Sequence, residues 1–151
     1  MSRMDFYHLQ KQSLFEVLPK LLLKAYTGKK RAVVKIGKSE ALETINTLLW
    51  TFQDDAFLPH GSKKDGSGKD QPIWLTSEDD NPNGAEFLFL CEGAEVLPEK
   101  MSEYERVFNI FDGNSTEAVE QARKMWKEYK TSGYEVFYWQ QNSNGKWEQK
   151  A

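Results

Sequence analysis

The chain has 151 residues, a formal net charge of -3 and a sequence pI near 5.5. This length fits a single core, so we predict one domain over residues 1–151. The acidic balance argues against general adhesion to nucleic acid or anionic membrane, so any polyanion must bind locally. We expect a cytoplasmic protein, because no apolar run approaches the roughly 20 residues that span a bilayer and "MSRMDFYHLQ" has no signal-like apolar core.

The first quarter of the chain alternates strand and helix. Residues 5–9, "DFYHL", are a strand candidate, and "SLFEVLPKLLLKAY" follows as a helix that Ser13 caps and Gly28 closes. Pro19 lies inside this stretch, so the helix bends there or its regular part begins near it. The β-branched run of residues 31–36, "RAVVKI", predicts a buried strand. Strand, helix and strand in this order open a parallel α/β sheet.

A second helix is predicted over about residues 39–52, followed by an apolar segment. Its core stripe has the three-and-four spacing of a buried face and consists of Ala41, Ile45, Leu48, Leu49 and Phe52. Trp50 points away from that stripe, so a following loop covers it or it is offered to a partner. The next apolar piece is "FLPHG", residues 57–61, and the two can form one surface.

The polar, glycine-rich residues 61–72, "GSKKDGSGKDQP", predict a mobile loop. Gly68 and Lys69 look like the end of a phosphate-binding loop. The motif fails elsewhere, because its first glycine would stand at Lys63 and because Asp70 replaces the Ser or Thr that should follow the lysine. We therefore expect no nucleotide site in this loop.

The second half of the chain predicts three strands, a helix and a hairpin. The strands are "PIWLT", "AEFLFLC" and "ERVFNIF", and the helix runs from about Ser115 to Ser132 with Gly133 at its end. In the tail "YEVFYWQQNSNGKWEQKA", Asn144-Gly145 is typical of a tight reversal. The fold class is therefore α/β, with a mostly parallel or mixed sheet flanked by helices and a C-terminal antiparallel hairpin.

The sequence shows no catalytic constellation. His8 and His60 lack the closely spaced ligands of a metal site, and neither a nucleophile elbow nor a dinucleotide fingerprint occurs. Cys91 cannot form an internal disulfide and is expected to pack as a small apolar side chain. We expect no cofactor, no metal and no enzymatic activity, while an enzyme with a site assembled from scattered residues stays an alternative.

The helix segment "QARKMWKEYK", residues 121–130, is basic and aromatic in an acidic chain. At about 100° per residue, one sector of roughly 100° holds Arg123, Trp126, Lys127 and Lys130. A different sector, the expected core face, holds Ala118, Ala122, Met125 and Tyr129. Lys124 lies on neither.

Two interpretations of the cationic sector stay open. It is a solvated face whose basic residues favour the helix C-terminus, or it binds a short peptide with negative charge and an aromatic or apolar end. Arginine and lysine form charge-assisted bonds to carboxylates, and an indole offers a wall for a ring.

The order of several segments resembles the chi subunit of bacterial DNA polymerase III across essentially the whole chain. These segments are "DFYHL", "LPKLLLKAYTGKKRAVV", "LWTFQDDAFLPHG", "QPIWLT", "VFNIFDG" and "ARKMWKEYKTSGYEVFYWQ". The resemblance implies a Rossmann-like three-layer fold without a dinucleotide, and a non-catalytic accessory subunit of the replicase. The C-terminal extension "QQNSNGKWEQKA" is similar to one branch of the family.

The resemblance also implies two partners. Family members bind the acidic tail of single-stranded-DNA-binding protein, which ends in phenylalanine, and the motif assigns this site to Arg123, Trp126, Lys127 and Lys130. Trp126 stands where some members have tyrosine, so a phenolic hydrogen bond is lost there. Members also join the clamp loader through a psi subunit, for which the candidates are Trp50, Phe57, Leu58, Pro59 and His60. The structural alternative is that "FLPHG" only closes the edge of the sheet. The alternatives are direct binding of single-stranded nucleic acid and an α/β enzyme that uses a nucleotide.

Overall fold

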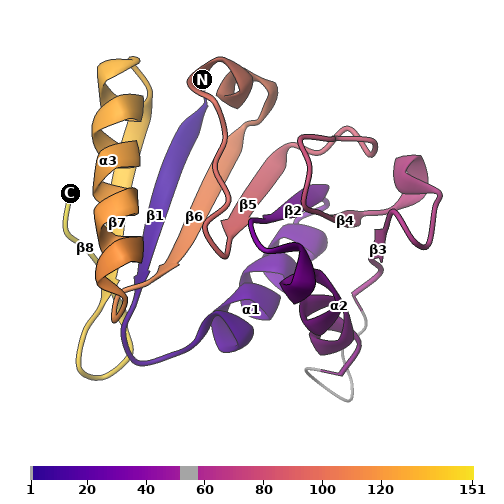
Figure 1. Ribbon diagram of the computed structural model, residues 1–151, viewed down its shortest axis with the longest axis horizontal. Helices are drawn as coiled ribbons and strands as arrows, with labels where there is room; N and C mark the ends of the chain where they lie inside the picture. Colours follow the sequence, from indigo (N-terminus) through magenta and orange to yellow (C-terminus); the bar gives the residue numbers. More distant parts are fainter. Residues whose placement is uncertain (1, 52–57) are drawn as a thin grey trace.

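The computed structural model describes residues 2–51 and 58–151. Within them, eight strands form one sheet in the order β3-β4-β2-β5-β6-β1-β7-β8 (Figure 1). The strands are β1 (Arg3–Leu9), β2 (Ala32–Ile36), β3 (Gly61–Ser62), β4 (Ile73–Thr76), β5 (Phe87–Cys91), β6 (Arg106–Asp112), β7 (Glu135–Gln141) and β8 (Trp147–Gln149). Every neighbouring pair is parallel except β7 and β8. This confirms the predicted α/β class and its antiparallel C-terminal pair.

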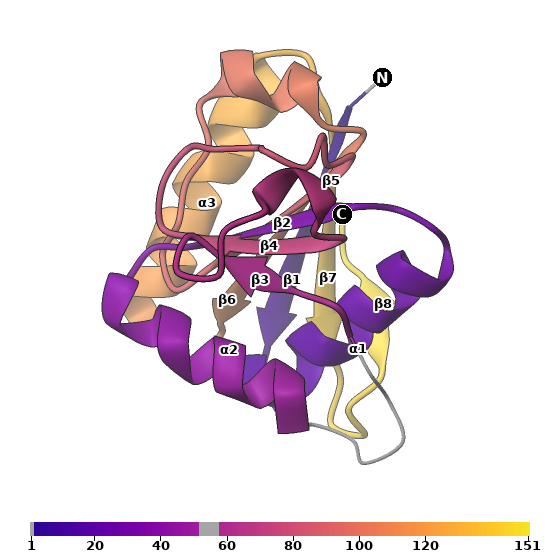
Figure 2. The same cartoon turned by 90° about the vertical axis from the view of Figure 1, so that its right-hand side faces the viewer.

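Helices cover both faces of the sheet. In Figure 2 the strands run between α3 (Thr116–Thr131) on the left and α1 (Leu14–Thr27) on the right. The helix α2 (Leu42–Thr51) packs into the same apolar cluster as α1, through Ile45 and Leu49. The 3-10 helix η3 (Pro98–Glu103) and α3 share the cluster on the opposite face. These helices and the sheet form the three layers of a Rossmann-like fold.

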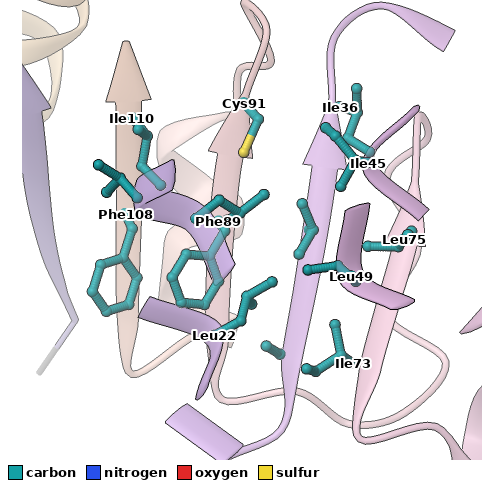
Figure 3. Packing of buried hydrophobic residues seen from close by; sticks show 14 of the residues in the cluster. Leu22, Ile36, Ile45, Leu49, Ile73, Leu75, Phe89, Cys91, Phe108 and Ile110 are labelled. Carbon is teal, nitrogen blue, oxygen red and sulfur yellow. The ribbon is translucent and has the colours of Figure 1, made fainter. Parts of the chain in front are cut away.

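The cluster under α1 and α2 is dense in aromatic and branched side chains. Figure 3 shows Phe89 and Phe108 side by side on neighbouring strands, and their rings stack with centroids 4.3 Å apart. Leu22 of α1 lies against the same strands. Cys91 is also buried here, as predicted, and burial raises the pKa of its thiol, so the thiol is an apolar packing group.

A buried ion cluster connects β1 with its two neighbours in the sheet, β6 and β7. The carboxylate of Asp5 is fully buried and accepts hydrogen bonds from Arg3 at 2.7 Å, Arg106 at 2.7 Å and Trp139 at 3.0 Å. Burial alone would raise the pKa of Asp5, but these three donors lower it below its usual value. Because the donors come from β1, β6 and β7, the cluster fixes these strands relative to one another.

The structure refines four of the predicted elements. α1 is continuous from Leu14, so Pro19 lies inside it rather than at its start. The second helix begins as a 3-10 turn, η1 (Ser39–Ala41), and its described part ends at Thr51. The expected loop over residues 61–72 contains the short strand β3 and the 3-10 helix η2 (Gly68–Asp70).

The fourth refinement concerns the hairpin. Its turn places Ser143 and Asn144 at the centre, because Gly145 N–H donates to Asn142 O at 2.9 Å. Gly145 follows in the left-handed conformation, with φ of 79°, where glycine has no steric cost. The expected reversal is present, but its centre lies one residue earlier than the Asn-Gly pair predicted.

Candidate functional site

Helix α3 has the two faces that its spacing predicts. Ser115 begins the helix by accepting the Ala118 N–H, and Gly133 follows its end with φ of 89°. Of the four residues predicted for the core face, Ala122, Met125 and Tyr129 are buried and Ala118 is half-buried. The opposite sector presents three exposed cations, Arg123, Lys127 and Lys130, while Lys124 is exposed on a different side. We call Arg123, Trp126, Lys127 and Lys130 the α3 surface.

Trp126 is the half-buried member of the α3 surface. Its ring lies 5.7 Å from the ring of Phe6 on β1 and meets Tyr138 on β7 edge-on at 5.9 Å. The Lys130 ammonium lies 5.7 Å from the indole centroid, within cation–π range. The indole is therefore held between the sheet and a surface cation, so it is fixed as a wall beside the charged groups.

Beneath α3, an aromatic cluster extends onto the sheet and includes two residues that the sequence did not assign to the site. Tyr138 Oη lies 2.6 Å from His8 Nδ1. Both rings also contact Phe111, at 6.0 Å for Tyr138 and 5.1 Å for His8. The available signal was the alternation along β7, which puts Val136 and Tyr138 on the face that α3 covers.

Arg123 acts electrostatically on this aromatic cluster. Burial lowers the pKa of His8 below its usual value, and the charge of Arg123 lowers it further, while Asp112 acts in the opposite direction. Burial raises the pKa of the Tyr138 hydroxyl, which Arg123 opposes. The guanidinium is therefore close enough to influence both groups, and His8 and Tyr138 are neutral near pH 7.

The residues predicted to contact the clamp loader are mostly apolar and partly buried. Trp50 is 55% exposed, and its ring lies 4.7 Å from the ring of His60, so the structure brings these two together. Leu58 and His60 are buried, and His60 Nδ1 lies 2.7 Å from Leu58 O. Pro59 is half-buried, and Phe57 lies outside the described residues. We call Trp50 with the underlying His60 and Leu58 the α2 surface.

A crevice of about 680 Å³ lies at the carboxyl ends of β1 and β6, where a Rossmann-like fold binds nucleotides. Its lining includes the first turns of α1 and α3, but both helix starts already carry their own partners. Ser13 N–H donates to Glu16 Oε1 at 3.2 Å, and Ser115 caps α3. The acidic side chains in the lining, Glu16, Glu92, Asp112 and Glu117, outnumber its two lysines, Lys11 and Lys38, and Lys38 is paired with Glu92 at 3.9 Å. This crevice is poorly suited to phosphate.

The described residues show no cation-binding centre. Among residues 2–51 and 58–151, no three His, Cys, Asp or Glu side chains are grouped so that they could hold a metal ion. Over the same ranges, no helix has the length and apolar character needed to cross a membrane.

The protein is a small Rossmann-like domain that presents three exposed cations beside a half-buried tryptophan on the outer face of α3. The family described as DNA polymerase III chi subunit, HolC, matches residues 1–137, and the chain belongs to this family. The chain is also 30% identical over 109 residues to a protein named probable DNA polymerase III subunit chi from Rickettsia prowazekii (strain Madrid E). That similarity covers 72% of this chain and 66% of the relative.

Proposed function

We propose that this protein is a non-catalytic accessory subunit of the bacterial DNA polymerase III holoenzyme and works in the cytoplasm. In this role it links the clamp loader to the acidic tail of single-stranded-DNA-binding protein during DNA replication. One observation carries the proposal, namely three exposed cations beside a fixed indole on α3 of a chain with net charge -3. Family membership supplies the setting in the replicase.

The α3 surface fits a tail that ends in aspartates and phenylalanine. Arg123 or Lys127 would bind the terminal carboxylate, because charge-assisted hydrogen bonds are among the stronger contacts available to an exposed peptide. Trp126 would form a wall of the phenylalanine site, since its position is fixed by Phe6 and Tyr138. Lys130 would meet the upstream aspartates.

Calorimetry with a synthetic peptide tests the tail site. Arg123→Ala is expected to weaken binding about 10- to 100-fold, because a hydrogen bond to a charged partner contributes about 1.5–3 kcal/mol. Lys124→Ala is the matched control, since Lys124 is exposed on the same helix but lies outside the α3 surface. Equal affinity for the peptide with and without its final phenylalanine would contradict the proposal.

We further propose that the α2 surface contacts the psi subunit or another component of the clamp loader. Trp50 is the exposed ring of this surface, while Leu58 and His60 support it from below. Trp50→Ala should abolish capture of the purified clamp-loader subunits of the same bacterium and leave peptide binding unchanged. Leu97→Ala is the control, because Leu97 is 56% exposed elsewhere on the molecule. Equal capture by both variants would exclude this contact.

Two other functions predict different results in simple assays. Direct binding of single-stranded DNA predicts strong binding to oligothymidylate with a steep fall as salt rises. A nucleotide-using enzyme predicts thermal stabilisation by nucleotides. We expect neither, because the net charge is negative and the crevice at the strand ends carries several carboxylates.

A further inference from the structure

The side chain of His8 is enclosed in a way that defines which of its nitrogens carries the proton. Its Nε2 is buried and makes no hydrogen bond, and a Cβ placed on Gly113 would lie 2.2 Å from that atom. Nε2 therefore lies against the backbone of Gly113, where any residue with a Cβ would clash with the ring. An N–H in this place would be an orphaned buried donor, which proteins tolerate less often than an unsatisfied acceptor. The proton consequently belongs on Nδ1.

This tautomer decides the direction of the bond to Tyr138. With the proton on Nδ1, His8 donates to the Tyr138 oxygen over the 2.6 Å separation. The phenolic hydrogen is then not used by His8 and can be donated to another acceptor. His8 thus holds the Tyr138 hydroxyl in place as a hydrogen-bond donor.

The charges around His8 are consistent with this neutral state. Arg123 approaches from α3 and disfavours a second proton on the ring, while Asp112 at the end of β6 favours one. Tyr138 contributes its hydroxyl from β7, and Phe111 contributes only a ring. Arg123 lies three residues before Trp126 on α3, and the Trp126 ring meets Tyr138 at 5.9 Å, so the guanidinium and the phenol lie beside the same indole.

We infer that Tyr138, positioned by His8, donates a hydrogen bond to the ligand carboxylate that Arg123 binds. The inference rests on the proposed function, since it adds a residue to the tail site. It also adds a hydroxyl donor to the site, because the indole of Trp126 has only its N–H to donate. Here β7 supplies the phenol, and its ring meets Trp126 edge-on at 5.9 Å.

The test compares two peptides on the full chain, one with a free terminal carboxylate and one with a terminal carboxamide. Tyr138→Phe is expected to weaken binding of the free acid about 10-fold and of the carboxamide less than 2-fold. Tyr134→Phe is the matched control, because the Tyr134 hydroxyl already donates to Pro98 O at 2.6 Å. This variant should bind both peptides like the wild type. Unfolding in urea checks that both variants fold.

The outcomes separate this inference from the proposed function. If the wild type binds the acid and Tyr138→Phe binds it equally well, the inference fails while the proposed function stands. If the wild type binds neither peptide, the proposed function fails and the inference falls with it. The ¹⁵N chemical shifts of the His8 ring give a readout that needs no peptide, and a proton on Nε2 instead of Nδ1 would overturn the positioning role.

Discussion

A histidine underlies each surface, because His60 contacts Trp50 directly and His8 contacts Tyr138, whose ring meets Trp126. The hydrogen-bond partners of these two histidines differ in chemistry. His60 Nδ1 lies against the carbonyl of Leu58, which can only accept, so the bond holds the local backbone and goes no further. His8 Nδ1 meets the hydroxyl of Tyr138, which can accept and still donate. The first arrangement leaves no donor for a partner, whereas the second leaves the Tyr138 hydroxyl hydrogen for the contact proposed above.

The charges on the two surfaces follow the same division. The α3 surface has three exposed cations around Trp126, and one of them, Lys130, lies over the indole. On α2, the cation that approaches from the loop, Lys64, is paired with Glu43 at 3.7 Å. The proposed acidic peptide is therefore opposite in charge to the α3 surface, whereas the partner proposed for the α2 surface needs no such charge.

The largest effect that would sharpen this contrast is on stability and involves Leu58. Leu58→Ala should lower the free energy of unfolding by about 2–5 kcal/mol, because its side chain is fully buried. Trp50→Ala should cost less than about 1 kcal/mol, because Trp50 is 55% exposed and substitutions at the surface usually change stability little. Urea denaturation measures both. Equal losses would show that the exposed ring of Trp50 stabilises the fold as much as the buried side chain of Leu58, which would contradict this division.

The next effect concerns pH and sharpens the role of His8. A lowered folded-state pKa means that the unfolded chain takes up a proton first as the pH falls. The contribution of His8 to stability is therefore fully present above its ordinary pKa of about 6.5 and is lost as the pH falls toward the folded-state value.

Urea denaturation at pH 7.5 and 5.5 checks this pH effect. The wild type should lose stability between the two conditions, by less than the loss caused by Leu58→Ala. His8→Gln should lose less than the wild type over this interval, because glutamine does not titrate. An identical loss in both proteins would show that other groups cause the pH dependence.

The faces of α3 could be predicted from sequence because they depend only on helical geometry. Three-and-four spacing separates Met125 and Tyr129 from Arg123 and Lys127 without knowledge of any other segment. Trp50 was placed off the core stripe of α2 by the same reasoning, and it is exposed. In both helices, the spacing within one segment was enough to predict which side chains face away from the core.

The partners of those faces could not be predicted, because they depend on the register between distant strands. Tyr138 reaches His8 only because β1 and β7 pair in parallel with Phe6 opposite Tyr138, across more than half the chain. The short strand β3 was also missed, since its two residues have no period of their own and are held by β4. The sequence therefore predicted the residues of the α3 surface but not His8 and Tyr138, which lie beneath it.

The smallest predicted effect tests whether position or total charge determines binding at the α3 surface. Lys130→Ala should weaken the acidic peptide about two- to fivefold, because an exposed ion pair or cation–π contact contributes up to about 1 kcal/mol. Lys124→Ala removes the same charge from the same helix, yet it should change the affinity by less than twofold. If both variants weaken binding equally in calorimetry, the peptide responds to the overall charge of α3, and the contrast between the two surfaces reduces to electrostatic attraction without a defined site.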